Sequence, residues 1–278
     1  MPISKRDLLL AMVSGLAASG AAGVPSAAAE GESAKPAPGH DMSGMPPSWY
    51  GSEKIAFLIY PKFTALDMVG PHYMLGNLMG ASTFIVAKTK DPITSDMGLV
   101  FTPSHSFGDC PKDIDIICVP GGTDGTLAAM EDEATMAFLK DRGARAKYIT
   151  SVCTGSLVLG AAGLLSGYKA TSHWAARDVL KDFGAEPVDA RVVADRNRIT
   201  GAGVTAGLDF GLALVAKLRD DAYAQSVQLL AEYAPEPPFN AGTLKTAPQP
   251  VAEMMTAMFP QFVANAHAAA KRATAKLK

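Results

Sequence analysis

The sequence carries no excess of charge of either sign. Lys and Arg number 25 and Asp and Glu number 27, which gives a formal net charge of -2 and a pI of about 6.2. Nucleic-acid binding calls for a basic face or a recognition motif, and the sequence offers neither. With 278 residues, 48% hydrophobic and 19% charged, the chain has the composition of one globular domain with tails. We therefore expect no nucleic-acid partner.

A long hydrophobic run is missing as well. The apolar stretch Leu8 to Val13 follows the basic pair Lys5-Arg6 and leads into small residues that end at Ala29. This stretch is too short, and too rich in Gly and Ala, for a permanent membrane anchor. Its order of a basic part, an apolar part and an Ala-x-Ala-like cleavage zone is typical of an export signal. We predict that residues 1–29 direct the protein to the periplasm, and Lys5-Arg6 resembles a twin-arginine signal with Lys in the first place.

Cysteine is scarce, and the number is odd. An exported protein with Cys110, Cys118 and Cys153 keeps at least one thiol unpaired. Cys118 lies in an apolar, strand-like run and is predicted to be buried. Cys110 precedes a proline in a loop, and nothing in the sequence indicates a disulfide between it and Cys118. The segment 30–50 is rich in Gly, Pro, Ser and Ala and is predicted to be a flexible linker, with its few His and Met residues holding no metal.

Strand-like and helix-like segments alternate over residues 51–240. Short apolar runs at 54–60 and 115–119 are typical of strands covered on both faces, the alternating segment 82–89 is predicted to be a second strand, and 148–152 is predicted to be another. Helical patterns follow at 67–79, 132–145, 156–164, from about 205, and at 222–233, while 191–200 reads as a hairpin. This alternation predicts an α/β fold with a doubly wound, mostly parallel sheet sandwiched by helices. Residues 241–278 are predicted to be a C-terminal tail, with a loose, solvated helix over 264–278.

The segment Ser151-Val152-Cys153-Thr154-Gly155 has the pattern of a nucleophile elbow. An elbow is a sharp strand-to-helix turn that presents its central residue at the carboxyl edge of the sheet, and it needs small residues on either side. The N-terminus of the following helix favours the thiolate form of a cysteine, which is the nucleophilic form. We therefore predict that Cys153 is a reactive nucleophile rather than a small apolar residue at a strand end.

Three other positions are candidates for the same site. Gly121 and Gly122 follow a neighbouring strand, so their N–H groups could approach a bound substrate closely and stabilise its negative charge. Asp67 stands near a helix start, where an Asp is usually a cap, although a carboxyl group beside a reactive thiol could serve as acid or base. His173 is a further candidate, because a Cys–His pair is a common catalytic arrangement, although a single His is more often structural.

Together these motifs resemble the ThiJ/PfpI superfamily of class I glutamine-amidotransferase-like proteins, and within it the isonitrile hydratase branch. The resemblance covers residues 54–248. It rests on the loop that contains Asp67, the Val-Pro-Gly-Gly turn at 119–122, the elbow at 150–156, the Thr-Ser-His-Trp segment at 171–174, and the Tyr-Ala-Pro-Glu-Pro-Pro-Phe segment at 233–239. Many members of the superfamily carry Glu where this chain has Asp67.

The resemblance implies a function and a set of roles. It implies a hydro-lyase that converts isonitriles to N-substituted formamides, with Cys153 as nucleophile, Asp67 as acid and base, and Thr154 as a supporting hydroxyl. It also implies a homodimer that acts on a small molecule without a cofactor. The members compared are typically cytoplasmic, so the predicted export signal is a departure from the family.

Three alternatives remain open from the sequence. One is another hydrolase on the same scaffold, similar to glyoxalases or deglycases, which would require Glu at position 67 and a well-placed His. Another is a transcription regulator of the AraC type, which would require a helix-turn-helix region that the segment after Pro238 is too short to hold. The last is a protein without catalytic activity in which Cys153 senses oxidants or serves in binding.

Overall fold

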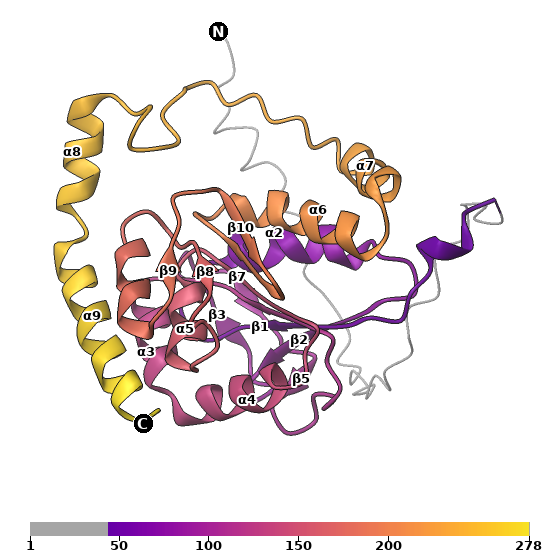
Figure 1. Cartoon of the computed structure of the whole chain (residues 1–278), viewed down its shortest axis with the longest axis horizontal. Coiled ribbons are helices and arrows are strands. Elements are labelled where there is room, and N and C mark those ends of the chain that lie inside the picture. The colour runs from indigo at the N-terminus through magenta and orange to yellow at the C-terminus, as the bar shows by residue number, and fades with distance from the viewer. Residues whose placement is uncertain (1–43, 278) are drawn as a thin grey trace, which may run out of the picture. The chain divides into compact units, whose positions relative to one another are not determined.

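Seven strands form the central sheet, and their order in space is β10-β11-β7-β6-β1-β2-β5. The structure is a computed structural model that describes residues 44–277 (Figure 1). All neighbouring strands in this sheet are parallel except the hairpin of β10 and β11. The predicted α/β class with a mostly parallel sheet is confirmed, and so is the hairpin. The strands of this sheet are β1 (Lys54–Leu58), β2 (Ser82–Ala87), β5 (His105–Ser106), β6 (Ile116–Val119), β7 (Tyr148–Val152), β10 (Val192–Asp195) and β11 (Arg198–Gly201).

The centre of the sheet is formed by β1, β6 and β7. The side chains of β6 are all buried, as are four of the five in β1 and in β7, which explains their nearly continuous apolar sequences. The chain leaves β1 toward β2 and later returns on the other side of β1 to form β6. Open α/β sheets bind ligands at such a switch point, outside the carboxyl ends of the strands.

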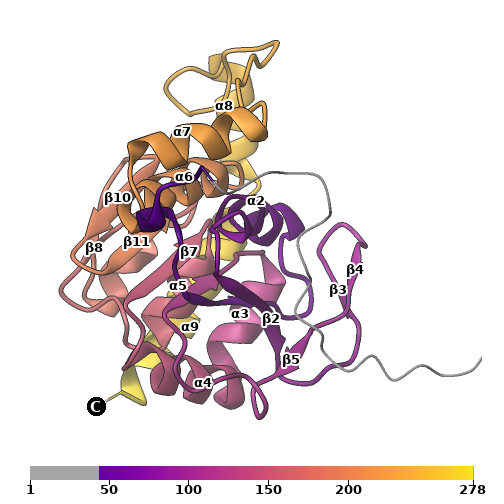
Figure 2. The ribbon, with the colours of Figure 1, turned by 90° about the vertical axis from the view of Figure 1, so that its right-hand side faces the viewer.

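Helices cover both faces of the sheet (Figures 1 and 2). One layer contains α2, α6 and α7, and the other contains α3, α4, α5, η2 and α9. Helix α3 and the 3-10 helix η2 were not expected from the sequence. Two small ribbons, β3 (Ile93–Thr94) with β4 (Val100–Phe101) and β8 (Lys169–Ala170) with β9 (Glu186–Pro187), lie outside the main sheet. The helices are η1 (Pro47–Trp49), α2 (Ala65–Gly76), α3 (Asp124–Glu131), α4 (Glu133–Gly143), α5 (Gly155–Ala161), η2 (Arg177–Phe183), α6 (Ala206–Leu218), α7 (Asp221–Leu230), α8 (Gln249–Ala257) and α9 (Pro260–Ala275).

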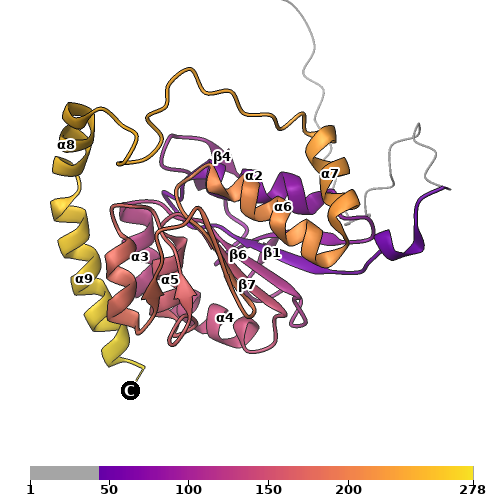
Figure 3. The ribbon, with the colours of Figure 1, turned by 45° about the horizontal axis from the view of Figure 1, so that its top comes forward.

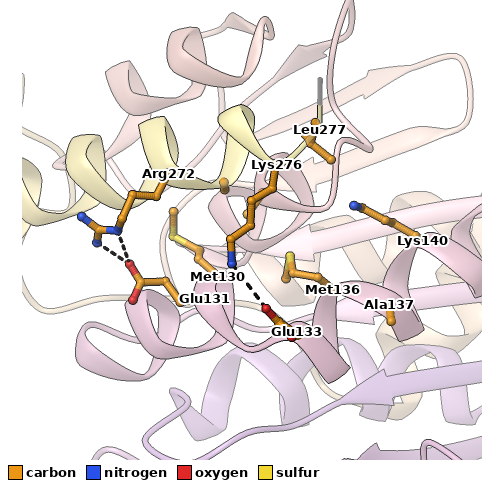
Figure 4. Close-up of a pocket in the computed structure, with 11 residues that line it drawn as sticks. Met130, Glu131, Glu133, Met136, Ala137, Lys140, Arg272, Lys276 and Leu277 are labelled. Atoms are coloured by element: carbon orange, nitrogen blue, oxygen red, sulfur yellow. Dashed lines mark hydrogen bonds and ion pairs between the residues drawn. The ribbon is translucent and has the colours of Figure 1, made fainter.

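The C-terminal segment differs from its prediction as a loose, solvated helix. Helix α9 packs against α3, α5 and η2 (Figure 3). Its inner face is a stripe of alanines, of which Ala266 and Ala270 are fully buried. Arg272 pairs with Glu131, and Lys276 pairs with Glu133 (Figure 4). The high Ala and Lys content suggested a solvated helix, but small side chains spaced along one face also allow a helix to approach its neighbours closely.

The start of the folded unit is held by Trp49, which lies at the end of the predicted linker. The indole N–H donates to Asp220, and the ring meets Tyr223 edge-on at 4.9 Å between ring centroids. The guanidinium of Arg219 donates to the Trp49 carbonyl and to Glu53.

The predicted export signal and most of the predicted linker lie outside the described residues. None of the helices within residues 44–277 has the length and apolarity needed to cross a membrane.

Candidate active site

Cys153 occupies a sharp turn between β7 and α5, as the elbow pattern predicts. Its φ angle is 57°, a left-handed conformation that is uncommon for a non-glycine residue and is often found at functional sites. The backbone holds this conformation, because the Cys153 N–H donates to Ala202 at 2.7 Å and its carbonyl accepts from the Ser172 hydroxyl at 3.1 Å. A Cβ atom at Gly155 would lie 2.2 Å from the Val119 carbonyl oxygen. Only glycine therefore lets the helix begin this close to β6.

Asp67 lies in the first turn of α2 and is completely buried. Its carboxylate does not cap the helix, since Oδ2 accepts a 2.8 Å hydrogen bond from the Gly121 N–H across the switch point. The other oxygen, Oδ1, is also buried and has no hydrogen-bond partner among the described residues. Burial of an unpartnered carboxylate oxygen is costly, so this atom is a candidate for contact with a substrate or a reacting water.

The loop after β6 joins the other two parts of the site. Besides the Gly121 contact with Asp67, the Gly122 N–H donates to the Thr154 hydroxyl at 3.0 Å. A Cβ atom at Gly121 would lie 2.5 Å from the Thr154 nitrogen and 3.0 Å from Asp67 Oδ2. The sequence predicted that both N–H groups would contact the substrate. In the structure they are engaged by Asp67 and Thr154, so they position the site's own side chains.

Burial sets the protonation of the Asp67–Cys153 pair. Burial raises the pKa of Asp67 to about 7, against the lowering effect of the Gly121 N–H and of the Cys153 thiol. The pKa of the Cys153 thiol is also raised, first by burial and then by the negative charge of Asp67, and the Thr154 N–H lowers it less. The sequence predicted that the helix N-terminus would favour a resting thiolate at Cys153. The raised pKa means that it does not. The resting site holds a neutral thiol beside a carboxyl group that ionises near neutral pH.

His173 lies outside this pair. Its ring packs against Trp174 and against Phe259 at the start of α9, with centroid distances of 5.2 Å and 5.7 Å. Its Nδ1 accepts a hydrogen bond from the Ala175 N–H at 3.3 Å, and burial lowers the pKa of the imidazole. Within residues 44–277 no hydrogen bond joins His173 to Cys153 or Asp67. The site thus pairs its thiol with a carboxyl group and not with a histidine.

The other two cysteines do not contribute to the site. Cys110, Cys118 and Cys153 are all free, and all are buried. Cys118 lies within β6, as predicted, and burial raises the pKa of its thiol to about 12. Cys110 lies in the loop before β6, and its carbonyl accepts from the guanidinium of Arg142. Neither thiol is placed for chemistry.

Sequence analysis missed two buried residues, of which one contacts the elbow and the other contacts the loop after β6. Thr126, in α3, lies 2.8 Å from Thr154 between the hydroxyl oxygens. Tyr60, just after β1, donates its phenol to the Pro120 carbonyl at 2.6 Å. Neither position carries a recognisable motif, because a buried Thr or Tyr is usually part of a core.

A pocket between α9 and α3, α4 and α5 shares no residue with the Asp67–Cys153 site (Figure 4).

A cysteine elbow with a buried carboxyl partner, at the switch point of a parallel sheet, defines a class of α/β proteins. Residues 53–217 match the model of the DJ-1/PfpI family, and the chain belongs to this family. It is 50% identical to the isonitrile hydratase of Pseudomonas putida over 200 residues, which are 72% of this chain and 87% of that protein. The predicted resemblance to the ThiJ/PfpI superfamily is confirmed.

Two further comparisons bear on fold and function. The crystal structure of a ThiJ/PfpI family protein from Pseudomonas syringae superimposes with a TM-score of 0.81 and 60% identity, over 83% of this chain and 98% of that one. The HTH-type transcriptional regulator GbdR of Pseudomonas aeruginosa is 29% identical over 182 residues. This chain spans about half the length of that regulator, 49%, whereas it spans nearly all of the hydratase.

Proposed function

We propose that the protein hydrates isonitriles to N-substituted formamides, with Cys153 as nucleophile and Asp67 as the acid and base. The observation that carries this proposal is the placement of Asp67. Its Oδ2 is fixed by Gly121, its buried Oδ1 is unpartnered, and the Cys153 thiol is near enough to lower its pKa. The 50% identity to a hydratase with that substrate supports the same reading.

The first step adds the thiol S–H across the terminal carbon of the isonitrile. The Asp67 carboxylate accepts the thiol proton while the Cys153 sulfur forms a bond to that carbon. Asp67 then delivers the same proton to the carbon, which completes a thioimidate, Cys153–S–CH=N–R. Because the resting thiol is neutral, the carboxylate must be ionised at the start, and a pKa of about 7 suits a group that both accepts and returns a proton.

The second step consumes one water. Asp67 removes a proton from the water as the water oxygen bonds to the thioimidate carbon, and passes that proton to the imine nitrogen. Asp67 then takes the hydroxyl proton of this tetrahedral adduct as the C–S bond breaks, returns the proton to the sulfur, and R–NH–CHO leaves. The backbone N–H of Thr154 lowers the pKa of the Cys153 thiol, so we assign to this group the stabilisation of negative charge on sulfur.

Turnover of cyclohexyl isocyanide tests the proposal. We expect the wild type to form N-cyclohexylformamide, and both Cys153→Ala and Asp67→Asn to lose at least ~1,000-fold in kcat/KM, as expected when a nucleophile or its base is removed. Cys110→Ala is the matched control, because this buried cysteine lies outside the site, and it should keep near-normal activity. A wild type that forms no formamide would refute the function. Equal rates in all four proteins would refute the site.

The same proposal includes a homodimer. Leu66, Val69 and Tyr73 lie along one outer stripe of α2 and are 41%, 41% and 43% exposed. An exposed apolar stripe on the helix that also carries Asp67 supports an interface beside the site. Light scattering should give twice the mass of the chain, and Val69→Glu should give the single mass. A single mass for the wild type at micromolar concentration would contradict the dimer.

Export is also retained as a proposal, on the pattern of residues 1–29. Mass spectrometry of the protein from a periplasmic fraction should show a mature N-terminus near residue 30. An intact N-terminus in the cytoplasmic fraction would contradict it.

A further inference from the structure

The Thr154 hydroxyl has no hydrogen-bonding capacity left for a substrate. A hydroxyl donates one proton and accepts at two lone pairs. The Thr154 Oγ1 donates to the Gly122 carbonyl at 2.6 Å and accepts from the Gly122 N–H at 3.0 Å. Its remaining lone pair faces the Thr126 hydroxyl at 2.8 Å. The hydroxyl therefore joins the elbow to the loop after β6.

This arrangement also determines the direction of the Thr126 hydroxyl. Since the Thr154 proton points to Gly122, the contact between the two threonines is a hydrogen bond only if Thr126 is the donor. The other neighbour of Thr126 is the Tyr60 phenol, at 3.3 Å between the oxygens. The phenol proton of Tyr60 is donated to the Pro120 carbonyl. Thr126 and Thr154 are 0% and 3% exposed, so water does not replace these contacts readily.

The contacts lead to Asp67 through the backbone of Gly122 and Gly121. Thr154 holds both the N–H and the carbonyl of Gly122, and the preceding residue, Gly121, donates its N–H to Asp67 Oδ2 at 2.8 Å. If Gly122 shifts, the direction of the Gly121 N–H shifts with it. We propose that Thr126 is a positioning residue, which orients the Thr154 hydroxyl and thereby keeps the Gly121 N–H on Asp67. The kinetic test of this inference rests on the proposed function, whereas the test by alkylation of Cys153 does not.

Thr126→Val removes the donor and keeps the shape of the side chain. The loosened Gly121 hydrogen bond favours the carboxylate of Asp67 less, so its pKa rises further. We expect kcat to fall about tenfold with KM little changed, as for the loss of one buried hydrogen bond. The acidic limb of the pH profile of kcat/KM should move upward by about one unit. Thr126→Ser keeps the donor and should restore both values.

Thr150→Val is the matched control. Thr150 is also a fully buried threonine, and its hydroxyl donates a single hydrogen bond, to the Ile117 carbonyl at 2.8 Å. Thr150→Val should lower the free energy of unfolding by about as much as Thr126→Val does, without moving the pH profile of kcat/KM. A pH limb that stays in place in Thr126→Val, or that moves equally in Thr150→Val, would overturn the proposal.

Alkylation of Cys153 provides a readout that does not depend on isonitrile turnover. The reactive form of the pair holds one proton, and the first proton to leave the doubly protonated pair determines the acidic limb of alkylation. The rate of iodoacetamide modification at Cys153 is measured against pH by peptide mass spectrometry. The acidic limb of this profile should move to higher pH in Thr126→Val and return to its original pH in Thr126→Ser. An unshifted alkylation profile would overturn the positioning role. A wild type that fails to hydrate isonitriles but shows this shift would refute only the proposed function.

Discussion

Asp67 and Cys153 are buried side by side and depend on each other for their protonation. The pKa of Asp67 is about 7, and the charge of Asp67 helps to raise the pKa of the Cys153 thiol. Two interacting groups of this kind release their protons as a pair, in two steps that are far apart in pH. Between those steps the pair holds one proton, which is the form that can both attack a carbon and protonate it.

The pH profile of kcat/KM should follow that pair. We expect activity to rise with pH around an apparent pKa of about 7, as the Asp67 carboxyl ionises, and to fall only in the alkaline range where the second proton leaves. Steady-state rates from pH 5 to pH 10 check this expectation. An acidic limb near pH 4, the ordinary range of an aspartate, would show that the reacting carboxyl group is not buried as described.

Stability should depend on pH through the same carboxyl group. The pKa of Asp67 is higher in the folded protein than its ordinary value of 3.8, so the folded state binds the proton more tightly. The resulting stabilisation is present at low pH and is lost as pH rises through about 7. Between pH 5 and pH 8 this amounts to about 3 kcal/mol.

Asp67→Asn should remove that dependence, since the amide does not ionise. Urea unfolding at pH 5 and pH 8 would measure it as a difference between the variant and the wild type. We expect the stability of Asp67→Asn relative to the wild type to be more favourable at pH 8 than at pH 5. A relative stability that does not change with pH would contradict the raised pKa.

Gly121→Ala should disturb both the active site and the stability of the fold. The added Cβ would meet the Thr154 nitrogen at 2.5 Å, and the loop must move to relieve this contact. We expect a loss of about 2 kcal/mol or more in the free energy of unfolding, together with a large fall in kcat. Gly242→Ala is the control, because nothing lies within 4 Å of a Cβ at that position. Normal activity of Gly121→Ala would show that the loop does not position Asp67.

Helix α9 should contribute to global stability. Ala270 is fully buried on its inner face, whereas Ala268 is exposed on the same helix. Ala270→Leu should cost about 1–3 kcal/mol, because the larger side chain forces α9 away from its neighbours. Ala268→Leu should be close to neutral. Similar melting temperatures for the two variants would mean that α9 is as loosely held as the sequence had suggested.

Much of the architecture could be predicted from local patterns. Strand-like segments of five to seven residues identified the central strands, and small residues around Cys153 identified the elbow, because burial on two faces and a tight turn each restrict the residues allowed at single positions. Gly121 and Cys153 could be assigned to one edge because the carboxyl ends of parallel strands meet there, whereas Asp67 was added to the site by the family resemblance.

The sequence by itself determined which groups meet at this edge, whereas only the tertiary structure decided their state. The local helix N-terminus predicted a thiolate at Cys153, but the desolvation that raises its pKa comes from residues throughout the fold. The N–H groups of Gly121 and Gly122 looked free, yet Asp67 and Thr154 engage them. The docking of α9 was likewise decided by complementary surfaces far apart in the chain. Burial and hydrogen-bond partnership are properties of the packed molecule, and no short pattern of residues encodes them.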